Sequence, residues 1–143
     1  ERLEYIELFQ ESRVAVVPST HDFANRQSLT VADLLDKPFA IPGEGAPRDL
    51  ISYWSLADIR EEPSRVAAIV NSIPEALAAV AYGGAFDTFP LSMTKAHHHP
   101  GIRYVPITDA SPNTMTLATI SGNRAPSIVA LRNCASKALG FVI

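Results

Sequence analysis

The chain has 143 residues, enough for one domain with a substantial core, and its 47% hydrophobic and 19% charged residues are typical of a globular protein. Its net charge of -3 provides no basic field for the phosphates of nucleic acid, so we do not expect this segment to bind DNA by itself. The single cysteine, Cys134, excludes an internal disulfide and favours a reducing, cytoplasmic setting, while the short apolar runs and the charged first residues predict neither a membrane span nor a secretory signal.

The first quarter of the chain predicts one clear strand and one capped helical turn. Residues 1–12 alternate only weakly between apolar and polar side chains and predict at most an edge strand. The run RVAVVP at 13–18 is apolar, rich in β-branched residues and ended by proline, which predicts a buried strand. Thr30 and Asp33 have the spacing of a capping box, so we expect a short helix over 30–35.

The next segment predicts a strand, a loop and a helix. Residues 37–42 form a short apolar run that contains two prolines, and GEGAP at 43–47 predicts a sharply bent loop. Apolar residues then recur at helical spacing over 48–59.

The centre of the chain predicts a strand, a capped helix and a second strand. VAAIV at 66–70 is typical of a buried strand, and Ser72 with Glu75 forms a second capping-box pattern. A glycine pair ending at Gly84 can close the helix, and residues 85–89 form the next strand. Strands joined through one helix are normally parallel, and ligands bind at the carboxyl ends of such strands, so the corner at Ser72 is the first candidate site.

The last third predicts two strands and a terminal helix. The strands are expected over 102–107 and 115–120, each bounded by turn-forming residues. Pro126 suits a helix start, and apolar residues then recur every three or four positions as far as Val142, predicting an amphipathic helix through about Gly140. The alternation of strands and helices indicates an α/β fold.

Patterns that would indicate chemistry are weak. Consecutive side chains such as His97–His99 do not converge on one metal ion, and His21-Asp22 reads as a turn because no nucleophile motif accompanies it. Cys134 reads as a buried or half-buried thiol, and the loop at 43–45 lacks the residues of a phosphate-binding loop. We therefore expect no metal, no cofactor and no catalytic residues.

Five segments, taken in order, carry a resemblance to a known family. They are ESRVAVVPSTHDFA, LTVADLLDKPFAIP, SIPEALAAVAYGGAFDTFP, PGIRYVPITDASPNTMTLATI and APSIVALRNCASKAL. Together they resemble the carboxyl-terminal effector-binding domain of LysR-type transcriptional regulators, which has the type II periplasmic-binding-protein fold. The resemblance rests on the order and spacing of the segments, and the chain departs from the usual family pattern at Asp22-Phe23 and at 86–88.

The resemblance implies an effector-binding domain fragment over 1–143, truncated at its amino end. One complete lobe is expected over 20–112, while residues 1–19 and 113–143 supply the crossover strands and terminal helix of an incomplete second lobe. Elements without partners expose apolar faces, so we expect residues 126–142 to pack on another copy or on a missing segment.

The resemblance also implies a function, which is the sensing of a small-molecule effector between the lobes by a cytoplasmic regulator. The implied partners are the effector, one or three further copies in a dimer or tetramer, and DNA through an amino-terminal domain absent here, with no membrane. From topology and resemblance, the expected effector contacts are Thr20, Pro42, Gly43, Glu44, Ser72, Ile73, Gly84, Ala85, Phe86, Asp87 and Thr119.

Two questions stay open at this point. The amides at the start of the Ile73 helix favour an anionic effector, whereas Glu44, Glu75 and Asp87 oppose one. The alternatives to a regulator are a free-standing solute-binding protein of the same fold, which the missing signal peptide disfavours, and an enzyme on this fold, which the lack of an assembled catalytic group disfavours.

Overall fold

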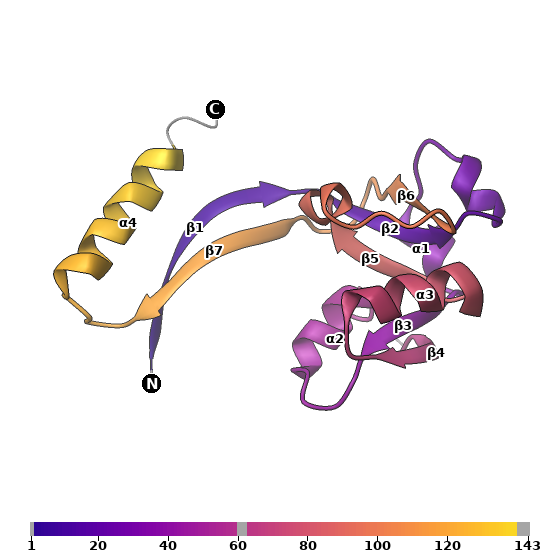
Figure 1. Ribbon diagram of the computed structural model, residues 1–143, viewed down its shortest axis with the longest axis horizontal. Coiled ribbons are helices and arrows are strands. Elements are labelled where there is room, and N and C mark those ends of the chain that lie inside the picture. Colours follow the sequence, from indigo (N-terminus) through magenta and orange to yellow (C-terminus); the bar gives the residue numbers. More distant parts are fainter. Residues whose placement is uncertain (1, 60–62, 140–143) are drawn as a thin grey trace. The chain divides into compact units, whose positions relative to one another are not determined.

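The computed structural model describes residues 2–59 and 63–139, which form two compact units (Figure 1). The sheet unit spans residues 12–111, and the ribbon unit combines residues 2–11 with residues 112–139. No described helix has the length and apolar character needed to cross a membrane.

The sheet unit is a mixed α/β structure. Its elements, in chain order, are β2 (Arg13–Pro18), the 3-10 helix η1 (Asp22–Asn25), α1 (Val31–Leu34), β3 (Pro38–Pro42), α2 (Arg48–Trp54), β4 (Arg65–Val70), α3 (Ile73–Gly83), β5 (Asp87–Pro90), the 3-10 helix η2 (Leu91–Lys95) and β6 (Ile102–Pro106). β2 pairs antiparallel with β5 and β6, and β3 pairs parallel with β4. A parallel bridge between Phe39 and Phe86 joins β3 to β5, which gives the strand order β4-β3-β5-β2-β6.

The core of the sheet unit lies on both faces of this sheet. Val14 and Val16 of β2 belong to one hydrophobic cluster, and Ala15 and Val17 belong to another. Because successive strand residues point to opposite faces, the two clusters cover opposite sides of the sheet. We call the side of Ala15 and Val17 the α1 face and the side of Val14 and Val16 the α3 face, after the helix whose apolar residues join each cluster.

The prediction that residues 66–70 form a buried strand is wrong in one respect. The strand is present as β4, but Val66 and Ile69 are 53% and 67% exposed. The reason is its place in the sheet, because β4 is the edge strand and β3 lies between it and β5. The parallel arrangement expected for this strand-helix-strand segment is confirmed, with one strand inserted between the two.

The helix predicted over 48–59 is shorter than expected, because α2 ends at Trp54. The Ser55 hydroxyl donates to the Ile51 carbonyl at 2.8 Å, and Leu56 then takes a left-handed conformation with φ of 60°. Leu56 is fully buried in the cluster on the α1 face. The chain therefore leaves helical geometry at Leu56, the residue whose side chain enters the core.

Both predicted helix caps form, with one difference. In α1 the Asp33 N–H donates to Thr30 Oγ1 at 3.4 Å and the Asp33 carboxylate accepts from the Thr30 N–H at 2.8 Å, as predicted. In α3 the Glu75 N–H donates to Ser72 Oγ at 3.3 Å. The Glu75 carboxylate, however, accepts from the Asn71 N–H at 2.8 Å and not from the Ser72 N–H that the capping-box pattern predicts.

The ribbon unit consists of β1 (Leu3–Glu11), β7 (Asn113–Ile120) and α4 (Pro126–Leu139). β1 and β7 pair antiparallel with an irregularity between Glu7 and Phe9, so the weak alternation of residues 1–12 does correspond to a paired strand. Arg132 of α4 forms an ion pair with Glu4 of β1, and this hydrogen bond is the main reason that the pKa of Glu4 is lowered to about 2.

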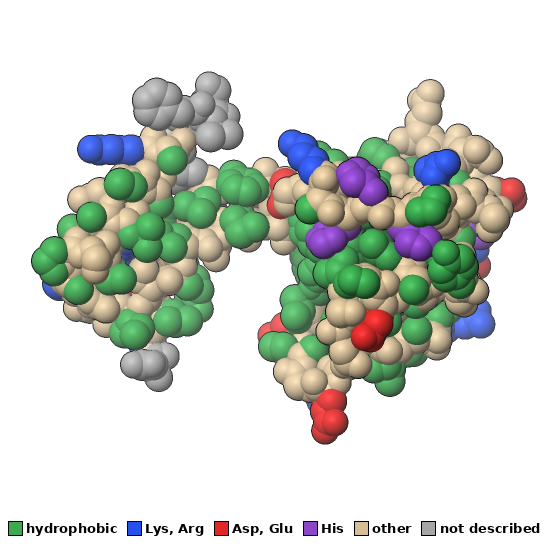
Figure 2. Space-filling view, viewed as in Figure 1, with side chains coloured by type: hydrophobic (Ala, Val, Ile, Leu, Met, Phe, Trp, Pro, Cys, Tyr) green, Lys and Arg blue, Asp and Glu red, His purple; other side chains and the backbone are tan. Residues whose placement is uncertain are grey.

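None of the described hydrophobic side chains of the ribbon unit is buried, and Tyr5 is 63% exposed. Figure 2 shows apolar side chains across the visible surface of these elements. Cys134 is exposed, so the prediction of a buried or half-buried thiol is wrong. Gly140 and Val142 of the predicted helix lie outside the described residues, and the packing expected for 126–142 stays a prediction.

Candidate functional site

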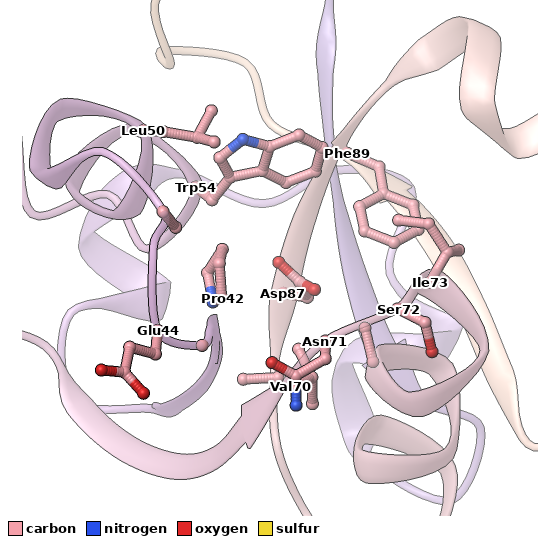
Figure 3. A pocket seen from close by; sticks show the side chains of 14 residues that line it. Pro42, Glu44, Leu50, Trp54, Val70, Asn71, Ser72, Ile73, Asp87 and Phe89 are labelled. Atoms are coloured by element: carbon pink, nitrogen blue, oxygen red, sulfur yellow. The ribbon is translucent and has the colours of Figure 1, made fainter.

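A pocket of about 400 Å³ opens on the α3 face of the sheet unit (Figure 3). It lies where β3 and β4 end and α3 begins, which is where α/β folds bind ligands. The described residues that line it are Ala40, Pro42, Gly43, Glu44, Ala46, Leu50, Trp54, Val70, Asn71, Ser72, Ile73, Ala76, Asp87 and Phe89.

The pocket brings together six of the residues predicted as effector contacts. They are Pro42, Gly43, Glu44, Ser72, Ile73 and Asp87. Parallel pairing explains this, because the Gly43 N–H donates to the Val70 carbonyl at 2.9 Å and so holds the loop after β3 against the chain that enters α3. Their contact with an effector itself stays a prediction.

The other five predicted contacts do not line this pocket. Thr20 is an exposed residue of the turn after β2, and Gly84 ends α3 in the left-handed conformation with φ of 68°, at the end of the helix far from the pocket. Ala85 and Phe86 are 0% and 3% exposed and belong to the two hydrophobic clusters. Thr119 belongs to the ribbon unit.

Sequence reasoning missed the apolar wall of the pocket. Leu50 and Trp54 come from α2, and Phe89 comes from β5, with the Trp54 and Phe89 rings edge to face at 5.5 Å between centroids. The four-residue spacing of Leu50 and Trp54 places both on one side of α2, a signal that was present in the predicted helix. The contact between this side of α2 and β5 joins residues far apart in the sequence, so no local pattern predicts it.

Gly43 has a specific steric role beside Asn71. A Cβ at position 43 would overlap the Asn71 side-chain oxygen, so the present position of the Asn71 side chain depends on glycine here. Asn71 lines the pocket and its backbone N–H is held by Glu75. The backbone at the mouth of the pocket is thus set by contacts between β3, β4 and α3.

Asp87 is the buried ionisable group of the pocket. It is 5% exposed, and its carboxylate accepts from the Thr88 N–H at 2.7 Å. Burial raises the pKa of Asp87 well above its ordinary value, and the Thr88 hydrogen bond opposes that shift only in part. The pKa of Tyr104, which lies across Val16 from Asp87 in the sheet, is also raised, by burial first and then by the charge of Asp87.

The histidine cluster does not form a metal site in the described structure. The His98 ring contacts the Lys95 carbonyl, whereas His99 Nδ1 accepts from the Gly101 N–H at 3.0 Å, so the neighbouring rings serve different parts of the backbone. His21 caps the turn at η1 through its Nδ1, which accepts from the Phe23 N–H. Across residues 2–59 and 63–139, no three His, Cys, Asp or Glu side chains are grouped so that they could hold a metal ion.

Comparison with solved structures identifies the fold. The effector-binding domain of BenM with its effector benzoate matches with a TM-score of 0.78 and 17% identity, over 97% of this chain and 64% of that one. The effector-binding domain of QuiR in complex with shikimate matches with a TM-score of 0.76 and 19% identity, over 99% and 67%. Full-length CbnR complexed with its target DNA matches with a TM-score of 0.75 and 18% identity, over 96% and 48%.

The chain therefore spans from about half to two thirds of the length of these solved proteins. A comparison with curated protein sequences finds no match. The family model for the LysR substrate binding domain matches residues 1–140, which is nearly the whole chain. With the type II periplasmic-binding-protein-like α/β fold that the structural matches support, this protein belongs to the LysR substrate-binding domain family, a family of transcriptional regulators.

Proposed function

We propose that the pocket on the α3 face of the sheet unit binds a small-molecule effector, and that the chain is the effector-sensing part of a LysR-type transcriptional regulator. The observation that carries the proposal is the pocket itself, about 400 Å³ with mostly apolar walls and a few polar groups at the carboxyl ends of β3 and β4. This combination of size, lining and position is typical of sites for small organic ligands.

The proposed activity is binding without chemistry. The Ser72 hydroxyl accepts the Glu75 N–H as a helix cap, and Asp87 accepts from the Thr88 N–H. No described nucleophile and base lie beside each other in the pocket lining. Steady turnover of any compound by the purified chain, abolished by Asp87→Ala, would contradict this proposal.

The remaining features of a regulator are proposed from the family alone. They are assembly into dimers or tetramers and recognition of DNA through a separate amino-terminal domain. Effector binding would then select among arrangements of the assembly that the DNA-binding domain converts into operator geometry.

A ligand screen with a blocked pocket tests the proposal. Aromatic acids, ring-bearing amines, amino acids and sugar phosphates would be screened by thermal shift on the wild-type chain and on Ala46→Phe. Ala46 lies in the loop after β3 and lines the pocket, so a phenyl group there fills it without entering the core. A ligand at one hundred times its dissociation constant stabilises by about 2.7 kcal/mol.

The matched control is Ala96→Phe, because Ala96 is exposed in the same unit and does not line the pocket. We expect at least one compound class to stabilise the wild type and Ala96→Phe equally and to have no effect on Ala46→Phe. If no compound stabilises the wild type, or if the blocked variant responds as strongly, the pocket is not an effector site.

A further inference from the structure

The side chain of Asp87 lies among apolar groups with most of its hydrogen-bonding capacity unused. An ionised carboxylate can accept about four hydrogen bonds, and from the described residues Asp87 accepts one, from the Thr88 N–H of its own strand. Figure 3 shows the carboxylate in the middle of the pocket, between Pro42 and Trp54 on one side and Ser72 and Ile73 on the other. A buried carboxylate whose one described hydrogen bond comes from its own strand is costly to ionise, so its presence in the pocket points to a group that arrives from outside.

The surroundings of Asp87 do not suit an anionic ligand. None of the described lining residues is Lys, Arg or His, and Glu44 adds a second carboxylate at the rim. At the start of α3, Pro74 has no N–H, the Glu75 N–H donates to the Ser72 hydroxyl and the Asn71 N–H donates to the Glu75 carboxylate, so these three positions are not open to an anion.

The apolar wall suits a cation that carries a ring. Trp54 and Phe89 present aromatic rings to the pocket, and a cation near the face of such a ring is attracted by its electrons. Pro42, Leu50 and Ile73 complete a wall that can enclose an apolar body. A ligand with an apolar ring and a nearby ammonium group would match both the wall and the carboxylate.

We propose that the effector of this pocket is a ring-bearing organic amine whose protonated nitrogen pairs with the Asp87 carboxylate. This inference rests on the proposed function and adds the chemical class of the ligand. The structural relatives bound to benzoate and shikimate hold ligands of the other charge, so the pocket of this chain would have a different specificity.

Matched probes of opposite charge test the inference. Benzylamine and phenethylamine would be titrated against phenylacetate and 3-phenylpropionate, which have the same phenyl ring and the same number of methylene groups between the ring and the charged group. Trp54 is the chain's single tryptophan and lines the pocket, so its fluorescence reports binding directly, with calorimetry as a second measure. We expect the amines to bind at least about tenfold more tightly than the acids, and Asp87→Asn to weaken amine binding about 10- to 100-fold.

The control is Asp36→Asn, because Asp36 has a side chain that is 76% exposed, lies outside the pocket lining and changes the net charge equally. It should leave amine affinity unchanged. Because each amine and its matched acid share the ring and spacer, their comparison separates the effect of charge from that of shape. Equal losses of amine affinity in both aspartate variants would contradict a specific pair with Asp87.

The pH dependence of amine binding to the wild type gives a first test, and two variants extend it. A cation needs ionised Asp87, so amine affinity should rise as the pH rises through the raised pKa of Asp87 and level off above it. The other ionisable groups around the pocket are Glu44 on the loop after β3 and Tyr104 on β6, while Glu75 of α3 accepts from the Asn71 N–H outside the lining and Arg13 of β2 points to the opposite face. Asp36→Asn should therefore keep the pH dependence, and Asp87→Asn should lose it.

The outcomes separate this inference from the proposed function. Acids that bind more tightly than amines, with affinity that falls as the pH rises, would show protonated Asp87 acting as a donor, which overturns the amine and leaves the effector site. Binding only by uncharged compounds from the wider screen, with no effect of Asp87→Asn, also overturns it. If no compound of any class distinguishes the wild type from Ala46→Phe, the proposed function fails and this inference fails with it.

Discussion

Among the described residues, each face of the sheet unit buries one ionisable side chain, and the two side chains have very different hydrogen-bond partners. Arg13 points to the α1 face, is 1% exposed, and donates to the Tyr53 carbonyl, to Thr88 Oγ1 and to Ser111 Oγ. Its guanidinium also lies 3.9 Å from the centre of the Tyr53 ring, and only its Nε lacks a partner among the described residues.

Asp87 points to the α3 face and accepts a single described hydrogen bond, from its own neighbour Thr88. Arg13 therefore connects β2, β5, the end of α2 and the loop before residue 112, whereas Asp87 makes no hydrogen bond to a distant segment within the described part of the chain. The buried cation therefore joins distant parts of the fold, whereas under the proposal above the buried Asp87 carboxyl pairs with a ligand.

Arg13→Met should have the largest effect on stability. Met fills much of the same volume but leaves the Tyr53 carbonyl and Ser111 without the guanidinium, so we expect a loss of about 2–4 kcal/mol in the free energy of unfolding. Urea unfolding followed through Trp54 fluorescence measures this in the sheet unit. Arg103→Met, at an exposed position of β6, is the control and should stay within about 0.5 kcal/mol of the wild type. A loss below about 1 kcal/mol for Arg13→Met would mean that the cation is not structural.

Asp87→Asn should have the opposite effect and increase the free energy of unfolding at alkaline pH. Because the folded pKa of Asp87 is raised, the folded state holds its proton more tightly, and wild-type stability falls as the pH rises from about 4 through the folded pKa. Asn cannot ionise, so the variant should exceed the wild type by about 1–2 kcal/mol at pH 8, and this gain should vanish near pH 4. Urea unfolding at the two pH values measures it. A variant that is less stable at pH 8 would show that Asp87 supports the fold.

Residues close in sequence were predictable, and contacts between distant segments were not. The caps at Thr30 and Ser72 depend on partners three residues away, so their spacing predicted them. The exposure of β4 depends on the strand order, and the burial of Asp87 depends on Trp54 and Phe89 meeting over it, none of which leaves a local pattern. The end of α2 was missed because Leu56, which adopts the left-handed conformation, is a residue type that gives no sign of it.

Asp33→Asn, in α1, should have a smaller effect on the free energy of unfolding. Asp33 accepts hydrogen bonds from Arg26 and from the N–H and hydroxyl of Thr30, which lower its pKa to about 2. Because the pKa of Asp33 is lowered in the folded state, its carboxylate stabilises the fold at pH values above the unfolded pKa of 3.8. This stabilisation is lost as the pH falls through the folded pKa of about 2. We expect a cost of about 1 kcal/mol at pH 7, comparable to the loss of a helix cap, which disappears by pH 2. A cost that is the same at both pH values would assign it to packing.

Gly43→Ala should have the smallest effect on stability and a clear effect on the pocket. The added Cβ overlaps the Asn71 side-chain oxygen, which is the free end of a flexible group, so Asn71 can turn away at a cost below about 1 kcal/mol. Because Asn71 lines the pocket, ligand affinity should change several-fold although the fold is kept. The matched substitution Gly83→Ala meets no atom within 4 Å in the last turn of α3 and should stabilise by about 0.5–1 kcal/mol without changing affinity. Thermal unfolding with and without phenethylamine measures both stability and affinity. Equal affinities in the two variants would place Asn71 outside the binding site and leave Asp87 and the aromatic wall as the groups that recognise the ligand.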